Sequence, residues 1–150
     1  MQLTLSQPTA NEMPVIAGYV KEFVLDDEGM REQQFIISKN NDQVVGFGRL
    51  KNHNYFSELC TLGVVTEYRG KGIGKTLVNE LIKKAAGKHI YVVCIIPTYF
   101  QKFGFEISEQ YPDIIKKKYA LCTQLFVVEE EYCVMKYNAE LRRQNEIRII

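Results

Sequence analysis

A glycine-rich, basic segment between a predicted strand and a predicted helix constrains this chain more than any other feature. It reads Tyr-Arg-Gly-Lys-Gly-Ile-Gly-Lys-Thr over residues 68–76. Glycines let the backbone adopt positive φ and approach a ligand closely. The first N–H groups of the following helix lack partners, and the helix dipole is positive at that end. With Arg69, Lys71 and Lys75 beside it, this turn is predicted to bind an anion, most naturally a phosphate.

Three nucleotide-binding motifs compete for this turn. The last three positions of a Walker A loop match residues 74–76, but Arg69 stands where that loop needs its opening glycine. A dinucleotide fingerprint that starts at residue 70 fails because position 75 is lysine. A third pattern, [RQ]-x-x-G-x-[GA], is matched by Arg69, Gly72 and Gly74. A tight turn without a ligand is the alternative, but three glycines interleaved with three cations exceed what a turn needs.

The third pattern is the pyrophosphate-binding motif of the GNAT superfamily (Gcn5-related N-acetyltransferases), which the chain resembles over roughly residues 33–105. Residues 62–74 are similar to the strand-to-helix segment of that family, and residues 99–105 resemble its aromatic helix that ends in Gly-Phe. The resemblance implies an α/β (α+β) domain. Its mixed central sheet would have two splayed central strands, here 55–65 and 90–96, and flanking helices.

Hydrophobic periodicity predicts the elements of such a fold along the chain. We expect helices at about 10 to the low twenties, 73–85, 99–103 and 113–121, and strands at 33–38, 43–50, 55–65, 90–96, 105–107 and 131–137. The near-continuous apolar run 90–96 is typical of a strand buried on both faces. We expect residues 1–137 to form a single acetyltransferase domain, and the sequence assigns no role to the tail 138–150.

The resemblance also implies how acetyl-CoA is held as the acetyl donor. The pantetheine arm would enter the gap between the splayed strands and pair with backbone groups near Leu62 and Val64. A backbone N–H there would polarise the thioester carbonyl. The cosubstrate-binding residues expected on this basis are Leu62, Gly63, Val64, Arg69, Gly70, Lys71, Gly72, Ile73, Gly74, Lys75, Thr76 and Phe100.

Two residues are candidates for proton transfer. Glu58 matches the position of the base glutamate in the histone-acetyltransferase branch, and a solvated carboxylate or a salt-bridge partner is the alternative interpretation. The family often protonates the leaving thiolate with a tyrosine four residues before the glycine of the Gly-Phe pair. Phe100 stands at that place, so either the neighbouring Tyr99 or water is expected to serve.

The acceptor is expected to be the primary amine of a small molecule. Residues 58–62 and 111–122 resemble short amino-acid acetyltransferases of the glutamate-acetylating type. A cation must then hold the substrate carboxylate, for which Arg49 is the candidate, with Arg31 and the lysines of 116–118 as alternatives. A solvated helix face is the simpler interpretation of the lysine run. A protein lysine or N-terminal acetyltransferase, a non-catalytic CoA-binding domain and a nucleotide-binding protein remain open.

Composition argues against several other classes of protein. The formal net charge of +1 gives no support for binding to nucleic acid or to a membrane surface. No apolar run is long enough to span a bilayer, and the N-terminus lacks the pattern of a secretory signal, so a cytoplasmic location is expected. The four cysteines and two histidines lack zinc-ligand spacing, and no metal is expected. A homodimer is expected by analogy with the family.

Overall fold

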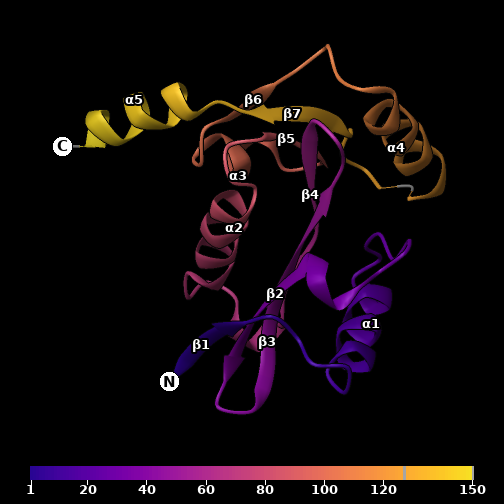
Figure 1. Cartoon of the computed structure of the whole chain (residues 1–150), viewed down its shortest axis with the longest axis vertical. Coiled ribbons are helices and arrows are strands. Elements are labelled where there is room, and N and C mark those ends of the chain that lie inside the picture. The colour runs from indigo at the N-terminus through magenta and orange to yellow at the C-terminus, as the bar shows by residue number, and fades with distance from the viewer. Residues whose placement is uncertain (127, 150) are drawn as a thin grey trace. The chain divides into compact units, whose positions relative to one another are not determined.

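The computed structural model describes residues 1–126 and 128–149, and it has the expected mixed α/β architecture (Figure 1). The elements in chain order are β1 (Leu3–Ser6), α1 (Met13–Glu22), β2 (Phe35–Asn40), β3 (Gln43–Asn52), β4 (Phe56–Val64), α2 (Ile73–Lys84), β5 (His89–Cys94), α3 (Pro97–Gln101), β6 (Phe105–Ile107), α4 (Asp113–Leu125), β7 (Cys133–Tyr137) and α5 (Ala139–Ile149). Short 3-10 turns at Glu32–Gln34 and Thr66–Tyr68 precede β2 and α2.

The chain forms two compact units that share β4. The first unit contains Met1–Asn52 and Leu59–Gly87, and the second contains His53–Glu58 and the described part of the chain from Lys88 onward. The strand order is β1-β2-β3-β4 in the first unit and β4-β5-β7-β6 in the second. Each unit is described separately below.

In the first unit, two helices cover opposite faces of the sheet (Figure 1). The core between α1 and the sheet consists of Ile16 and Val20 of the helix with Phe35, Ile37, Val44 and Phe47 of the strands. The core between α2 and the sheet consists of Ile73 and Leu77 of the helix with Val45 of β3, and Ile36, Leu62, Val64 and Tyr68 pack around them. Alternation of neighbours such as Ile36 and Ile37 between the faces follows from the period of two of a strand. The sheet of this unit is therefore buried on both sides.

Two glycines of β3 allow α2 to lie directly on the sheet. A Cβ atom on Gly46 would lie 2.8 Å from Cγ2 of Ile73, and one on Gly48 would lie 2.6 Å from Cδ1 of Leu81. Both separations are too short for real Cβ contacts. The close approach fixes the helix whose first turn follows the glycine-rich segment.

In the second unit, β7 pairs antiparallel with both β5 and β6. Helix α4 packs through Ile115 on a cluster that contains Phe56, Tyr91 and Val134. The C-terminal residues expected to be an unassigned tail form α5. Its first turn is capped by Asn138, whose Oδ1 accepts hydrogen bonds from the amides of Glu140 and Leu141 at 3.0 and 3.2 Å.

Most predicted elements are confirmed, with corrections at their ends. Helix α1 begins at Met13 rather than near residue 10, and just before it the carboxylate of Glu12 accepts a 2.9 Å hydrogen bond from the amide of Thr9. Strand β1 was not expected, because its four residues are all exposed and carry no core pattern. Helix α4 runs four residues beyond the expected end at 121. Within the described residues, no helix combines the length and apolarity needed to cross a membrane.

Candidate functional site

The glycine-rich segment forms an open helix N-terminus. Gly70 and Gly72 have φ of +78° and +81°, and a Cβ atom on either would meet no other atom within 4 Å. Gly72 is the N-cap of α2, so no side chain caps the helix. The bond from the amide of Thr76 to the carbonyl of Gly72 is 3.1 Å long. The amides of the first turn precede it and lack intrahelical acceptors, so they can bind an anion.

The residues flanking this turn hold it in place. Nε of Arg69 donates a 2.9 Å hydrogen bond to the carbonyl of Val64, and its guanidinium lies 5.0 Å from the ring centre of Phe23 on α1. The hydroxyl of Tyr68 accepts a 3.2 Å hydrogen bond from Nδ2 of Asn40 at the end of β2. The side chains of Lys71 and Lys75 are exposed beside the turn. The charge of Arg69 is thus anchored at the turn, and the two lysines add mobile charge.

Three of the expected cosubstrate-binding side chains point elsewhere. Ile73 is buried in the core of the first unit, so only its backbone can face a ligand. The hydroxyl of Thr76 donates a 3.1 Å hydrogen bond to the carbonyl of Gly72 in its own helix. Phe100 is buried, with its ring centre 5.6 Å from that of Phe105. The roles assigned to these residues remain predictions.

A strained residue interrupts β4 just before the segment expected to pair with pantetheine. Thr61 has φ of +50°, which is rare for a β-branched residue. Its hydroxyl donates a 2.8 Å hydrogen bond to the carbonyl of Asp26, and this bond helps to hold the conformation. Backbone strain of this kind costs about 1–3 kcal/mol and is concentrated at functional sites. The left-handed conformation of Thr61 changes the direction of the backbone N–H and C=O groups from Leu62 to Val64, relative to a regular strand. No pattern in the sequence indicates this change.

Arg49 on β3 is fully buried in the first unit. Its Nε donates a 2.9 Å hydrogen bond to Oε1 of Gln34, and its Nη2 donates to the carbonyl of Glu28. The guanidinium lies 5.7 Å from the ring centre of Phe35. Nη1 is buried and has no hydrogen-bond partner among the described residues. Arg49 therefore ties the segment before β2 to β3, and a carboxylate ligand can reach Nη1 only if that segment moves.

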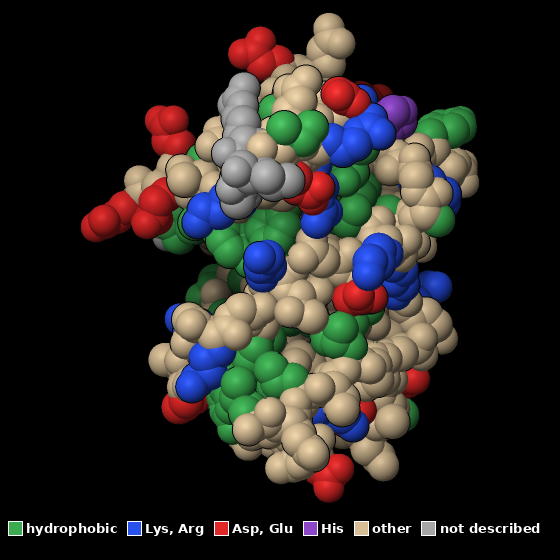
Figure 2. All heavy atoms as spheres, turned by 90° about the vertical axis from the view of Figure 1, so that its left-hand side faces the viewer, with side chains coloured by type: hydrophobic (Ala, Val, Ile, Leu, Met, Phe, Trp, Pro, Cys, Tyr) green, Lys and Arg blue, Asp and Glu red, His purple; other side chains and the backbone are tan. Residues whose placement is uncertain are grey.

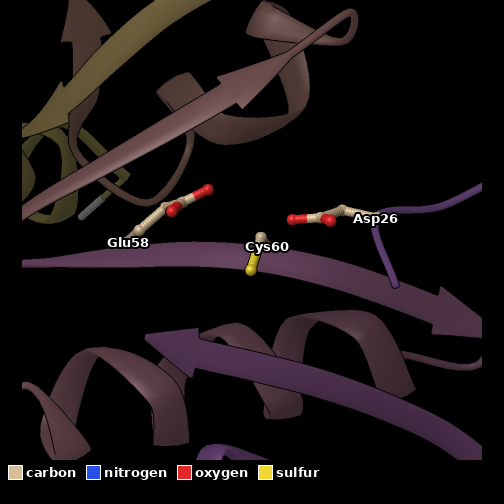
Figure 3. A group of neighbouring side chains, drawn as sticks. All are labelled: Asp26, Glu58 and Cys60. Carbon is tan, nitrogen blue, oxygen red and sulfur yellow. The ribbon is translucent and has the colours of Figure 1, made fainter. Parts of the chain in front are cut away.

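Lys51, two residues after Arg49 on β3, pairs with a carboxylate. Nζ of Lys51 is 3.0 Å from Oδ2 of Asp26. Figure 3 shows Asp26 with Cys60 of β4, and their ligand atoms lie within 4.8 Å of each other. Glu58 is two residues before Cys60 on the same strand. Because a lysine already pairs with Asp26, a metal ion there would first have to displace it.

Glu58 is buried in an ion pair in the second unit. Its side chain is 2% exposed, and Nζ of Lys118 on α4 lies 2.6 Å from its Oε2. Nε2 of His53 lies 3.8 Å from its Oε1. His53 stacks on Phe56, with ring centres 4.7 Å apart. We call His53, Glu58 and Lys118 the Glu58 cluster.

The lysines of 116–118 were interpreted more simply as a solvated helix face, and this interpretation is wrong for Lys118. Lys116 and Lys117 are exposed, whereas the side chain of Lys118 is only 11% exposed. Lys118 follows the buried Ile115 by three residues and precedes the buried Cys122 by four, so all three share one face of the helix. That spacing is the signal that could have identified Lys118 from the sequence.

Tyr99 lies in an aromatic group on α3. Its ring centre is 5.3 Å from those of both Phe100 and Phe103. Burial raises the pKa of the Tyr99 phenol above its ordinary value of 10.0. The phenol therefore keeps its proton at neutral pH, although it gives that proton up less readily than a free tyrosine.

The cysteines of β5 and β7 face each other as reduced thiols. Sγ of Cys94 lies 3.9 Å from Sγ of Cys133. Burial, with the charge of Cys133, raises the pKa of Cys94 to about 12. The thiolate is the nucleophilic form, so Cys94 is a small buried side chain of the core rather than a nucleophile.

The fold is that of an α/β protein, and its open helix N-terminus can accommodate an anion such as a phosphate. The acetyltransferase (GNAT) family model matches residues 6–105. The chain therefore belongs to the GNAT acetyltransferase family, a family of acetyl-CoA-dependent N-acetyltransferases. The predicted family and fold class are confirmed.

Solved structures of N-acetyltransferases are similar to this chain. N-acetylglutamate synthase from Neisseria gonorrhoeae, complexed with coenzyme A and N-acetyl-glutamate, has a TM-score of 0.74 at 18% identity, over 91% of this chain and 35% of that one. Rv2747 from Mycobacterium tuberculosis, in complex with CoA, has a TM-score of 0.72 at 20% identity, over 89% and 98%.

Naa50 from Arabidopsis thaliana, in complex with the bisubstrate analogue CoA-Ac-MVNAL, has a TM-score of 0.66 at 19% identity, over 92% of this chain and 99% of that one. At these identities the similarity shows the fold. The chain spans about a third of the length of the synthase.

Proposed function

We propose that this chain transfers the acetyl group of acetyl-CoA to the primary amine of an amino acid. The proposal for the donor rests on the glycine turn, residues 69–76. Its positive-φ glycines and uncapped first helical turn suit the pyrophosphate of CoA. The expected side-chain contacts come from Arg69, Lys71 and Lys75, while the other positions would contribute their backbone amides.

We propose direct attack of the amine on the thioester. Glu58 takes a proton from the acceptor amine, the amine nitrogen forms the new bond to the acetyl carbon, and the CoA sulfur leaves as a thiolate. Backbone groups that follow the strained Thr61 stabilise the oxyanion. Water is the simpler source of the proton for the thiolate, because burial raises the pKa of Tyr99 and makes its phenol a weaker acid. Tyr99 is the side-chain alternative.

The observation that carries the acceptor class is a buried, unpaired positive charge. No carboxylate of the described residues pairs with Arg49, and its Nη1 lacks a partner. An unsatisfied buried N–H costs about 1–3 kcal/mol, so a ligand carboxylate that satisfied it would be stabilised. The structures of N-acetylglutamate synthase with N-acetyl-glutamate and with L-arginine are consistent with an amino-acid acceptor.

Acceptor specificity can be tested by CoA release from acetyl-CoA with each of the common L-amino acids. A parallel series would use peptides with free N-termini, because the bisubstrate analogue bound to Naa50 carries a peptide sequence. We expect saturable turnover with at least one free amino acid and little with peptides. Turnover restricted to peptides would replace the amino-acid acceptor with a protein acceptor.

Donor binding is tested separately by calorimetric titration with acetyl-CoA beside Mg-ATP. Saturable acetyl-CoA binding without turnover on any amine would instead indicate a non-catalytic CoA-binding domain. Binding of Mg-ATP alone would revive the Walker interpretation of residues 74–76 and contradict the donor assignment.

We also propose that the protein is a cytoplasmic homodimer in which residues 1–137 form one acetyltransferase domain. We propose that it binds neither nucleic acid nor a membrane and needs no metal. On the face drawn in Figure 2, acidic and basic side chains are interspersed and form no broad basic field, which supports only the proposal that nucleic acid is not a partner. Light scattering of the purified protein tests the dimer. A monomer at micromolar concentration would contradict it.

A further inference from the structure

Three sulfur atoms lie together on one face of the sheet in the second unit. Cys94 and Cys133 are directly opposite each other on the neighbouring strands β5 and β7 (Figure 1), and Met135 is two residues further along β7. Side chains two residues apart on a strand point to the same face. Sγ of Cys94 lies 3.9 Å from Sγ of Cys133 and 3.6 Å from Sδ of Met135. The sheet therefore places two thiols and a thioether within reach of one ion.

The spacing of these sulfurs is that of metal ligands. A metal ion about 2.3 Å from each sulfur, an ordinary metal–thiolate bond length, would have an angle of about 115° between the two cysteine sulfurs. The corresponding angle between the sulfurs of Cys94 and Met135 would be about 105°. Such angles are typical of trigonal and tetrahedral coordination. The strands therefore hold the sulfurs close to the geometry that an ion needs.

The donor set selects the kind of ion. Thiolate and thioether ligands favour soft ions such as Cu(I), whereas carboxylates and water favour hard ones. A structural zinc site takes four ligands, and within the described residues no histidine, aspartate or glutamate joins Cys94 and Cys133 as a further ligand. Met135 is fully buried and Cys94 is 7% exposed, while Cys133 is partly exposed. An ion can therefore enter past Cys133 and be held away from water.

The high pKa of Cys94 does not prevent coordination. Each thiol gives up its proton as its sulfur bonds to the ion, because a coordinating thiol is deprotonated outright. The amide of Ile96 donates a hydrogen bond to Sγ of Cys94, and this contact favours the thiolate form. Two thiolates and Cu(I) carry one net negative charge, which solvent can reach at the partly exposed Cys133. A thiol that is a poor nucleophile can therefore still be a metal ligand.

We propose that Cys94, Cys133 and Met135 form a binding site for the soft metal ion Cu(I), which links β5 to β7. The ion takes no part in the proposed acetyl transfer, so the site does not depend on that function. Zinc-ligand spacing in the sequence could not reveal this site, because its two cysteines are 39 positions apart and its third ligand is a methionine.

Binding is tested with Cu(I) supplied as its coloured bicinchoninate complex to reduced protein without oxygen, where loss of the colour measures transfer of copper. Cys94→Ala and Cys133→Ser each remove one thiolate, and Met135→Leu removes the thioether at nearly constant volume. Each cysteine variant has a matched control. Cys122→Ala removes another buried cysteine, and Cys60→Ser removes another partly exposed one.

We expect wild type and both controls to take up one copper ion per chain. Loss of an outer-shell partner alone weakens metal binding about 10–100-fold, so loss of either thiolate should weaken it at least about 100-fold. The weaker thioether ligand should contribute about tenfold, which Met135→Leu would show. Unchanged affinity in any of the three site variants, or loss of uptake in Cys60→Ser, would overturn the site. Tighter binding of Zn(II) than of Cu(I) would overturn the choice of ion.

Thermal unfolding separates a lost ligand from a damaged fold. Without metal, Cys133→Ser should melt close to wild type, because the side chain is partly exposed. An ion that binds the folded state raises Tm, so Cu(I) should raise the Tm of wild type and of Cys60→Ser but not that of Cys133→Ser. An equal rise in all three proteins would place the copper elsewhere and overturn the proposal.

Discussion

The glycine turn and the Glu58 cluster are built in opposite ways. The turn is exposed and offers backbone amides, and its geometry comes from Gly70 and Gly72, two glycines of one short segment that both have positive φ. The cluster is buried and offers side chains, and its two main members are 60 positions apart in the sequence. A site made from backbone needs only a local conformation, whereas a site made from buried charges needs packing to bring and hold them together. The turn should therefore tolerate side-chain changes that the cluster does not.

The largest effect is expected at the cluster, in Glu58→Gln. Removing a general base reduces kcat by about 10²–10⁴-fold. Glutamine keeps the shape and an oxygen that can accept from Lys118, so the fold should persist, which a melting curve checks. The dissociation constant for acetyl-CoA should be unchanged, because the turn is built independently. Full turnover of this variant at every pH, measured by CoA release, would show that Glu58 is not the base.

At the turn, Gly72→Ala is best compared with Gly87→Ala. The two glycines lie at opposite ends of α2, with φ of +81° and +84°, and each has open space where a Cβ atom would stand. The left-handed conformation costs either alanine about 1–2 kcal/mol, so both should lower stability similarly. Only Gly72→Ala should weaken acetyl-CoA binding, by about tenfold or 1.4 kcal/mol in a calorimetric titration. Equal affinities in the two variants would mean that the turn does not bind the donor.

The contact beneath the turn can be tested with Gly48→Ala. The new Cβ atom would lie 2.6 Å from Cδ1 of Leu81, so the buried Leu81 side chain or α2 itself would have to shift. Overpacking of this kind costs about 1–3 kcal/mol, which a denaturant titration measures. Gly18→Ala, where no atom lies within 4 Å, is the control and should be neutral or better. If Gly48→Ala proved as stable as the control, the helix would not be held as closely as the structure shows.

The smallest effect is expected outside both regions, at Glu12. Its backbone hydrogen bond from Thr9, together with the nearby Lys39, lowers the pKa of Glu12 below its ordinary value of 4.5. A lowered pKa stabilises the fold above the unfolded-state value, and this contribution is lost as pH falls through the folded-state value. The difference in unfolding free energy between wild type and Glu12→Gln should be less than about 1 kcal/mol near neutral pH, because the pair lies at the surface, where solvent screens it. The difference in unfolding free energy should shrink as the pH falls, because the Glu12 carboxylate becomes protonated. A difference that increased in acid would contradict the prediction.

The sequence predicted the regular elements better than their ends. Helix α2 was expected from Ile73, where it begins, and the expected strand 105–107 is β6 itself. These elements carry strong local patterns: an apolar stripe that follows the glycines in one case, and an aromatic residue after Gly104 in the other. Strand β1 could not be predicted, because an exposed edge strand is defined by its hydrogen bonds to β2 rather than by its own composition.

In the candidate site, too, the features with a local sequence pattern could be predicted and those that depend on tertiary contacts could not. The conformation of the glycine turn could be predicted, since glycine at positive φ and unpaired amides at a helix start are properties of the local chain, whereas its binding of the donor stays a prediction. Glu58 was selected by resemblance, but its lysine partner was taken for a surface residue. The burial of Arg49 and the left-handed Thr61 carried no local signal, because arginine and threonine are both ordinary residues in a strand.

The sequence by itself therefore determined the family, the order of most elements and the conformation of the glycine turn, all of which follow from short-range pattern and backbone conformation. Tertiary structure decided which charges are buried and with whom they pair. Lys118 meets Glu58 only because Ile115 and Cys122 turn that face of α4 inward, and Arg49 is sealed only because the segment around Glu28 and Gln34 folds over β3. The physical reason is that a buried charge is tolerated only with a partner, and such partners come from distant parts of the chain.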